Sequence, residues 1–264
     1  MNDTLFQSPY AITDAQVDFY RENGYVRLED VLTMEEVEAV RAALDRAMER
    51  RQSFSRDLAG GGDKILQMLN LWEHDEVLKA YATNPRLAGI AKRLTGSATV
   101  SLFHDQALVK KPGPSAASPW HQDQPYWPSK EAGMLSCWMA LDDVTEDRGA
   151  MQFVPGSHKW GEFAPIEFSG EGAQLEELIP ETERENWKPV VEELKAGSCT
   201  WHHGLTAHFT RPNTTPHTRR ALVTIYIPEG VTYAADEKMD HPLSNTITSK
   251  KGEALRGSKF LELA

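Results

Sequence analysis

The pattern of apolar and polar positions divides the chain into two parts. In the first part, apolar residues recur at helical spacing in three segments, 14–23, 34–51 and 85–94. Each segment follows a residue type that caps helices: Thr13, Thr33 in a capping box with Glu36, and Asn84. Glycine follows the first and the third segments, as expected at helix ends. The pattern predicts a helical supporting region over residues 1–97.

Beyond residue 97 the pattern changes to short alternating or β-branched runs that glycine and proline interrupt. These runs cover residues 98–111, 134–144, 150–155, 198–203 and 219–228. Closely spaced short strands predict a mainly β fold with supporting α-helices, a jelly roll or barrel over residues 98–228, rather than alternating βαβ units. Residues 229–264 are then a C-terminal tail, and the chain 1–264 is expected to form a single domain.

Residues 161–195 interrupt the strand pattern. They carry ten glutamates against three basic residues, Arg184, Lys188 and Lys195. Such a charge balance favours a solvent-exposed helical insertion between the strands. A lid over a site is the alternative, because long insertions in compact domains often cover active sites.

Composition and charge exclude several functions. The net charge of −11 opposes binding to nucleic acid or to an anionic membrane surface, and the sequence holds no basic stripe with interleaved aromatic residues. Cys137 and Cys199 are the only cysteines, which favours a reducing, cytoplasmic setting over a disulfide framework. The first residues do not resemble a signal peptide, and no apolar run reaches the length that spans a bilayer. We therefore expect a cytoplasmic protein.

The stretch SPWHQDQPYWP contains a candidate pair of metal ligands, His121 and Asp123. On a strand, side chains two positions apart point to the same face, so the imidazole and the carboxylate can meet at one point. By itself, such a pair more often lies on the protein surface and binds no metal. A third ligand is required for a metal site.

The stretch WHHGLTAHFTRPNTTPHTRRAL offers candidates for that ligand, namely His202, His203, His208 and His217. We favour His208, because it follows the turn at Gly204 on a strand-like piece and precedes Arg219. Two histidines and one carboxylate on one face of a metal leave open positions, as in non-heme Fe(II) oxygenases, whereas a structural zinc site has four closed ligands. Iron therefore fits the pattern better than zinc.

An iron site of this type needs a reductant for O₂, and a 2-oxo acid with a distal carboxylate would need a cationic partner. Arg219 can bind such a carboxylate through two parallel hydrogen bonds, and the Thr210 hydroxyl can add a third. The alternative for Arg219 is an exposed arginine at a strand end.

These motifs together resemble the phytanoyl-CoA dioxygenase-like branch of the Fe(II)/2-oxoglutarate-dependent oxygenases. The similarity runs from about Ile12 to about Pro228 and includes KKPGPSAASPWHQDQPYWP, CWMALDDVTEDRGAMQFVPGSHKWG and HHGLTAHFTRPNTTPHTRRAL in that order. The resemblance implies a double-stranded β-helix and the use of Fe(II), 2-oxoglutarate and O₂. It implies iron ligands at His121, Asp123 and His208, an anchor for the distal carboxylate at Arg219 with Thr210, and pocket residues at Trp138 and Gln106.

The resemblance also guides the remaining residues. Some relatives hold 2-oxoglutarate with a lysine from a segment that here reads LQMLNLWEHD, so Gln67 or Asn70 is the candidate substitute. Related halogenases replace the carboxylate ligand with a small residue, and the intact Asp123 therefore favours hydroxylation. Tyr126 and Trp127 are candidate substrate contacts, although aromatic residues at strand ends usually pack.

Two other histidines are better explained by structure. His158 lies in a Pro-Gly-Ser turn, and His104 fits a satisfied histidine in a barrel wall.

The expected function is an oxidoreductase that hydroxylates or otherwise oxidises an unactivated C–H bond of a small metabolite and releases succinate and CO₂. One alternative is a jelly-roll binding protein that has lost catalysis. Another is a cupin-like metal isomerase or hydrolase that uses the same ligands without an oxo acid.

Overall fold

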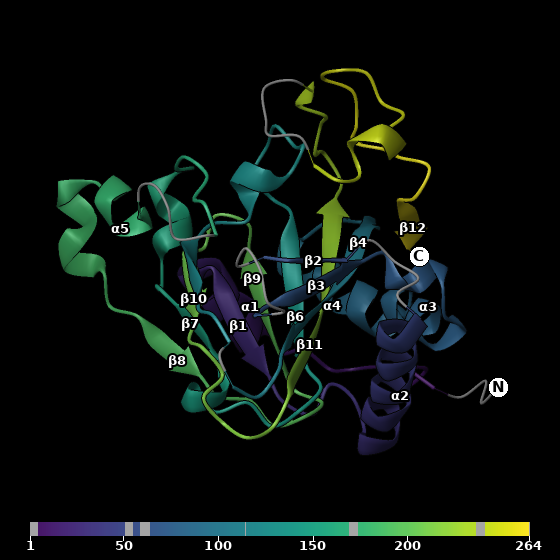
Figure 1. Cartoon of the computed structure of the whole chain (residues 1–264). Helices are drawn as coiled ribbons and strands as arrows, with labels where there is room; N and C mark the ends of the chain where they lie inside the picture. The colour runs from purple at the N-terminus through teal and green to yellow at the C-terminus, as the bar shows by residue number, and fades with distance from the viewer. Residues whose placement is uncertain are drawn as a thin grey trace.

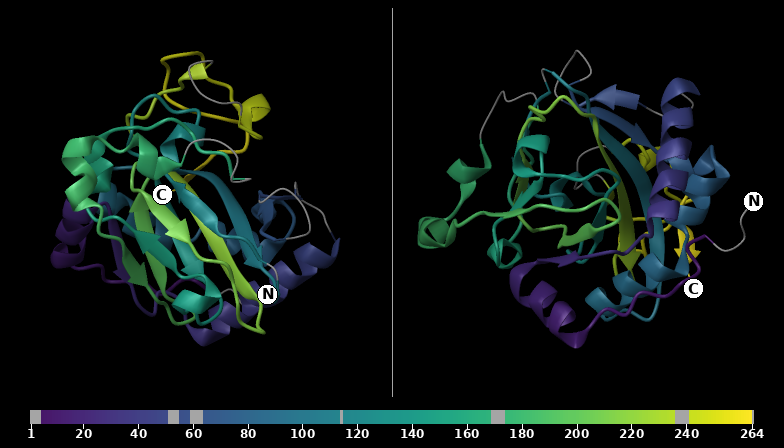
Figure 2. Two further views of the ribbon diagram at one scale, coloured as in Figure 1. Left: turned by 60° about the vertical axis from the view of Figure 1, so that its left-hand side comes forward. Right: turned by 90° about the horizontal axis from the view of Figure 1, so that it is seen from below.

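Two antiparallel β-sheets face each other across the interior of the protein (Figures 1 and 2). The structure is a computed structural model that describes residues 5–50, 55–58, 64–113, 115–168, 174–235 and 241–263. The sheets form the predicted jelly roll. The described residues 229–235 and 241–260, which follow the last long strand, lie above the upper end of that strand in Figure 1.

The larger sheet has eight strands. In spatial order they are β1 (Tyr25–Leu28), β9 (Cys199–His203), β6 (Leu135–Ala140), β11 (Arg219–Pro228), β4 (Val100–Lys110), β3 (Leu66–Leu69) and β2 (Ser55–Asp57), with β12 (Leu261–Leu263) paired to β4. The smaller sheet has the order β5 (Ser118–His121), β10 (His208–Thr210), β7 (Met151–Phe153) and β8 (Val190–Glu192). The register places His208 opposite His121 and Arg219 opposite Lys110, so both ends of the predicted site are fixed by strand pairing.

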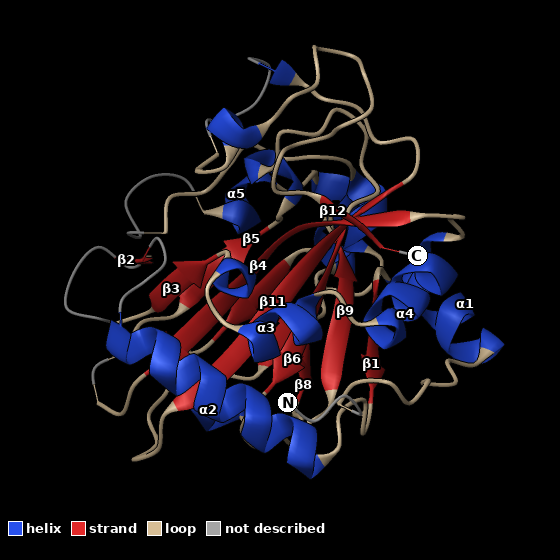
Figure 3. Cartoon of the chain, turned by 90° about the vertical axis from the view of Figure 1, so that its right-hand side faces the viewer, coloured by secondary structure: helices blue, strands red, loops and turns tan. Residues whose placement is uncertain are grey.

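Helices cover the outer face of the larger sheet (Figure 3). They are α1 (Asp14–Asn23), α2 (Met34–Arg50), α3 (Glu76–Ala82) and α4 (Pro85–Thr95), and a fifth, α5 (Leu175–Leu178), lies in the acidic insertion. The predicted caps are confirmed at Thr13, Thr33 and Asn84, and Gly24 and Gly96 end their helices in the left-handed conformation.

Each long strand of the larger sheet is buried on both faces. In β6 the Cys137 and Met139 side chains pack outward against the helices, whereas Trp138 and Ala140 belong to a second core inside the barrel. Alternation along the strand thus separates a structural face from a face that lines the interior. The residues of the site come from this inner face.

The predicted strands of residues 98–228 and the three predicted helices are confirmed, but the prediction of a helical supporting region over residues 1–97 omitted three strands. This region also supplies β1, β2 and β3, and the tail supplies β12. These strands have three or four residues each, too few for the alternating pattern to show in the sequence. The acidic insertion likewise contributes β8 to the smaller sheet. None of the described helices is long and apolar enough to cross a membrane.

Candidate active site

Three side chains converge between the two sheets at the end of β5. His121 is the last residue of β5, His208 is the first residue of β10, and Asp123 follows β5 directly. Oδ1 of Asp123 lies 3.7 Å from Nε2 of His121 and 3.7 Å from Nε2 of His208. One donor atom from each residue lies within 4.8 Å of the other two, which is the spacing of ligands around one metal ion.

Asp123 reaches this point by a different route from the one that the sequence predicts. Strand β5 ends at His121, and the backbone of Asp123 is in the right-handed helical region, just before the 3₁₀ helix η2 (Gln124–Tyr126). The two side chains therefore meet across a turn and not through the alternation of a strand. Pro125 at the start of η2 favours this turn over a longer strand.

The backbone fixes which nitrogen of each histidine is available. Nδ1 of His121 lies 2.7 Å from the carbonyl oxygen of Pro119, and Nδ1 of His208 lies 2.9 Å from that of Thr206. Because a carbonyl oxygen only accepts hydrogen bonds, both Nδ1 atoms carry the proton and both Nε2 atoms keep a lone pair. The lone pairs face Oδ1 of Asp123.

The other oxygen of Asp123 is held by two donors. Ser136 donates its hydroxyl to Oδ2 at 2.9 Å, and His202 donates Nε2–H to the same oxygen at 3.1 Å. Such outer hydrogen bonds orient a metal ligand. His202, one of the unselected candidates for the third ligand, is thus a supporting residue that sequence reasoning did not identify.

The environment also sets the protonation that a metal requires. Burial lowers the pKa of His121 and lowers the pKa of His208 well below its usual value. Burial alone would raise the pKa of Asp123, but His208, His202 and His121 outweigh it and hold this pKa below its usual range. Two neutral imidazoles and one carboxylate therefore face one another at neutral pH.

A second cluster at the far end of the interior is cationic. Arg219 is buried, donates from Nη1 to the carbonyl of Leu108 at 3.0 Å, and lies 5.3 Å from the ring centre of Trp138. Its buried Nε–H has no hydrogen-bond partner among the described residues. Burial lowers the pKa of Arg219 and Asp142 partly opposes this change, yet a guanidinium stays protonated at neutral pH. The position suits an anionic ligand.

Lys110 is a functional candidate that the sequence analysis missed. It lies directly opposite Arg219 in the β4–β11 pair and donates from Nζ to Oγ1 of Thr210 and to the carbonyl of Arg211, each at 2.7 Å. Burial and Arg219 hold its pKa well below the usual value. Within the described part of the chain, neither cation pairs with a carboxylate. The alternating pattern of residues 98–111 predicts that Lys110 lies on the same face as Gln106. Lys110 could therefore have been recognised from the sequence.

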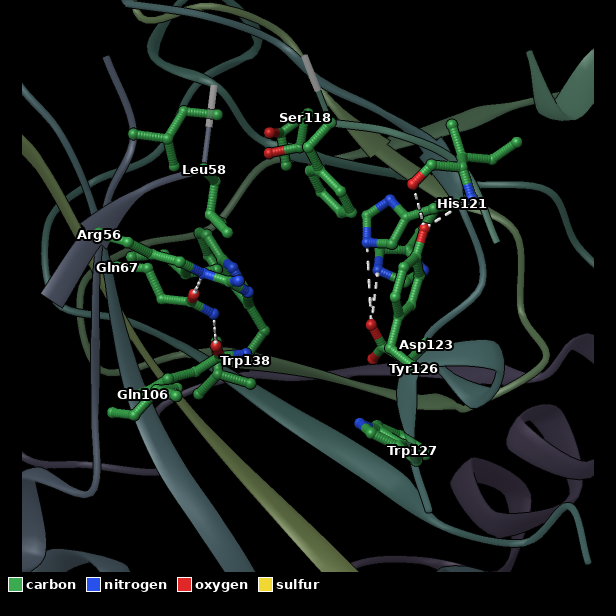
Figure 4. Close-up of a pocket in the computed structure, with 18 of the residues that line it drawn as sticks. Arg56, Leu58, Gln67, Gln106, Ser118, His121, Asp123, Tyr126, Trp127 and Trp138 are labelled. Atoms are coloured by element: carbon green, nitrogen blue, oxygen red, sulfur yellow. Dashed lines mark hydrogen bonds and ion pairs between the residues drawn. The ribbon is translucent and has the colours of Figure 1, made fainter. Parts of the chain in front are cut away.

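A cavity of about 440 Å³ connects the two clusters (Figure 4). On one wall Arg56 donates to Gln67 at 2.6 Å, and Gln67 donates to Gln106. On the other wall Tyr126 and Phe168 pack near His121. Phe168 belongs to the beginning of the acidic insertion, so this insertion supplies part of the cavity wall.

Comparison with known proteins identifies the family of the chain. The sequence profile of the family described as phytanoyl-CoA dioxygenase (PhyH) matches residues 20–221. The chain belongs to the phytanoyl-CoA dioxygenase family. It is a dioxygenase of the class that uses Fe(II), 2-oxoglutarate and O₂, as the resemblance of its motifs implies.

Individual relatives of this dioxygenase are distant in sequence and close in structure. A probable phytanoyl-CoA dioxygenase of Caenorhabditis elegans is 24% identical over 77% of this chain and 72% of its own length. An ectoine dioxygenase of Bordetella bronchiseptica is 26% identical over 82% of this chain and 75% of its own length. The crystal structure of the non-heme alpha ketoglutarate dependent carbocyclase SnoK from nogalamycin biosynthesis has a TM-score of 0.82 and 27% identity, and covers 97% of this chain and 100% of SnoK.

The epimerase SnoN, in a complex with Fe³⁺, alpha ketoglutarate and nogalamycin RO, has a TM-score of 0.78 at 26% identity, covering 95% of this chain and 98% of SnoN.

The structure of this dioxygenase brings nearly all predicted site residues to one cavity. The residues that line it include His121, Asp123, His208, Arg219, Thr210, Trp138, Gln106, Gln67, Tyr126 and Trp127. Asn70 is the exception. It precedes the 3₁₀ helix η1 (Leu71–Glu73), is buried, and does not line this cavity, so its side chain is not placed to contact a ligand there.

Proposed function

We propose that His121, Asp123 and His208 hold the iron of this dioxygenase. The observation that carries the proposal is the hydrogen bonding of both Nδ1 atoms to backbone carbonyls, which leaves both Nε2 lone pairs directed toward Oδ1 of Asp123. Two histidines and one carboxylate occupy one face of a metal and leave the opposite face to other ligands.

We further propose that the cationic cluster receives the distal carboxylate of 2-oxoglutarate. Arg219 offers an unpartnered Nε–H, Thr210 lines the same cavity, and Lys110 donates a hydrogen bond to the Thr210 hydroxyl from behind it. Binding a carboxylate there would compensate the buried charge of Arg219, which forms no ion pair with a described carboxylate. Trp138 and Gln106 would line the space between this anchor and the metal ligands.

The iron, 2-oxoglutarate and O₂ together supply the oxidising power that breaks an unactivated C–H bond, with release of succinate and CO₂. The protein's own residues orient the ligands, keep the two histidines neutral and enclose the site. Asp123 is present where a halogenase would have a small residue, and this favours hydroxylation or another oxygen-dependent oxidation over halogenation. The substrate is a small molecule, and two buried free cysteines suit a cytoplasmic location.

The proposal is tested by decarboxylation of 2-oxoglutarate. Protein loaded with Fe(II) without oxygen is mixed with 2-oxoglutarate, pooled metabolites and air, and succinate is measured. We expect succinate from the native protein and from His217→Ala, whose histidine is exposed, and none above background from His121→Ala. Equal succinate from His121→Ala and the native protein would contradict the ligand assignment. A jelly roll without catalysis would give no succinate from any of the three proteins.

A further inference from the structure

Two histidines outside the metal cluster line the same cavity. His104 lies on the inner face of β4, and His241 comes from the segment that follows β11. Their ring centres are 5.3 Å apart with an angle of 34° between the ring planes, and the Phe103 ring contacts both. The metal site does not account for either residue, and the sequence analysis expected His104 to be only a wall residue.

The backbone gives the two imidazoles opposite polarity. Nδ1 of His104 lies 3.2 Å from the carbonyl oxygen of Asp105 and must donate, so its Nε2 is a bare acceptor. The backbone N–H of Leu243 donates to Nδ1 of His241 at 3.2 Å, so in the neutral ring the proton lies on Nε2. Neither Nε2 atom has a hydrogen-bond partner among the residues that the structure describes.

Both rings are neutral at physiological pH. Burial lowers the pKa of His104 to about 4, and Asp105 and Asp123 oppose this change only in part. Burial, His104 and Arg56 together hold the pKa of His241 well below its usual value. The cavity therefore presents one acceptor and one donor side by side, without charge. His104 and His241 line the same cavity as Asp123.

We propose that His104 and His241 together bind a hydroxyl group of the substrate, and that the substrate is an alcohol or phenol with an apolar ring body. This inference rests on the proposed function for its reaction class. A hydroxyl donates to His104 and accepts from His241 through a single oxygen atom. The ring centres are 5.3 Å apart, so the two side chains are close enough for one ligand oxygen to contact both rings at hydrogen-bond distances of about 2.8 Å.

Other polar groups fit the pair less well. A carboxylate has no proton to donate to Nε2 of His104, and an ammonium group has no lone pair to accept from Nε2 of His241. The cavity wall contains the aromatic residues Tyr126, Trp127 and Phe168 among aliphatic ones. Such a wall packs against a ring body, while the histidines supply the specific polar contact.

The test compares α-naphthol with its methyl ether as probes. Equilibrium dialysis without oxygen measures their affinities for the full-length protein loaded with Fe(II) and 2-oxoglutarate. His104→Phe and His241→Phe keep an aromatic ring and remove its nitrogens, and His217→Phe is the matched control at an exposed histidine. We expect the native protein and the control to bind α-naphthol about 10-fold more tightly than the ether, since the ether has no proton to donate to His104. His104→Phe should reduce this preference to about 2-fold, whereas His241→Phe should weaken the binding of both probes.

Unchanged affinity for the methyl ether shows that His104→Phe has folded. Since His241 is only partly buried and lies outside the strands, His241→Ala provides a second variant if His104→Phe is unstable, and it should weaken the binding of both probes. The inference is overturned if the native protein shows no preference for the hydroxyl, if the preference survives His104→Phe, or if the His241 variants bind both probes as tightly as the native protein. Succinate formation is measured separately. If the protein forms succinate but does not prefer the hydroxyl, the hydroxyl inference fails and the proposed function stands. If it prefers the hydroxyl but forms no succinate, the proposed function fails instead.

Discussion

His202 donates a hydrogen bond of 3.1 Å to Oδ2 of Asp123, the carboxylate oxygen that is not aimed at His121 and His208. Neighbouring strands of the larger sheet thereby set the direction of a carboxylate that lies in a turn after β5 of the smaller sheet. Ser136, which is paired with His202 in the register of β6 and β9, donates to the same oxygen. The orientation of Asp123 is thus a property of both sheets together.

Replacement of His202 should weaken metal binding without removing a ligand. In His202→Phe, we expect the dissociation constant for Fe(II) to rise about 10–100-fold, because Asp123 loses one of the two donors that orient it. An anaerobic competition titration against a coloured chelator measures this constant, with His217→Phe as the control. An unchanged constant would show that Ser136 alone positions the carboxylate.

Removal of the carboxylate should stop oxygen transfer. Asp123→Gly leaves His121, His208 and the cationic cluster in place, so we expect 2-oxoglutarate still to bind while product formation falls by at least about 1000-fold, equivalent to about 4 kcal/mol. Isothermal titration measures the first quantity and succinate release the second. Full activity in this variant would mean that Asp123 is not a ligand.

The two buried cations should act on the affinity for 2-oxoglutarate. We expect Arg219→Met to raise KM for 2-oxoglutarate about 100-fold, because charge-assisted hydrogen bonds contribute about 1.5–3 kcal/mol each. Lys110→Met should raise KM about 10-fold, because Thr210 loses the donor that orients its hydroxyl. Arg211→Met is the control, since Arg211 is exposed and pairs with Glu146. If Lys110→Met changes only the melting temperature and not KM, Lys110 has a structural role alone.

The metal-free protein should lose stability as the pH falls from about 7 to about 5. Burial lowers the pKa of His104 and of His203 to about 4 from the ordinary value of 6.5, so below pH 6.5 the unfolded chain binds protons that these folded residues do not. Each such histidine then costs about 1.4 kcal/mol per pH unit. His121, His208 and His241 have lowered pKa values and act in the same direction.

Two carboxyl groups oppose this trend. Burial raises the pKa of Asp105 to about 7 and also raises the pKa of the part-buried Glu192, so their contributions to stability increase as the pH falls, but the histidines outnumber them. Thermal unfolding monitored between pH 5 and pH 7 checks the balance. His104→Phe should flatten the dependence, and a melting temperature that stays constant over this range would contradict the argument.

Sequence reasoning reached the parts of the site that lie on long strands or in recurring motifs. His121 and His208 could be predicted from the sequence because each belongs to a recurring motif. Arg219 could be predicted because it begins a long apolar strand. Asp123 lines the cavity as predicted, but the prediction assumed the wrong local structure. A turn and a strand can both bring the side chains of His121 and Asp123 together.

The missing parts depend on pairing between distant segments. Alternation along β4 could have placed Lys110 on the inner face, but its position opposite Arg219, 109 residues later in the chain, depends on a strand register that no local pattern encodes. His241 approaches His104 only through the path of the chain after β11. Short strands such as β1 are stabilised by their neighbours in the sheet rather than by their own composition.

The central claim is that one iron is held by His121, Asp123 and His208 next to a bound 2-oxoglutarate. Visible absorption of the anaerobic protein tests it most directly. Addition of 2-oxoglutarate to the Fe(II)-loaded native protein should produce a weak charge-transfer band from the iron chelate. The band should be absent in His208→Ala and retained in His217→Ala. No band in the native protein at saturating iron and 2-oxoglutarate, or an undiminished band in His208→Ala, would contradict the account.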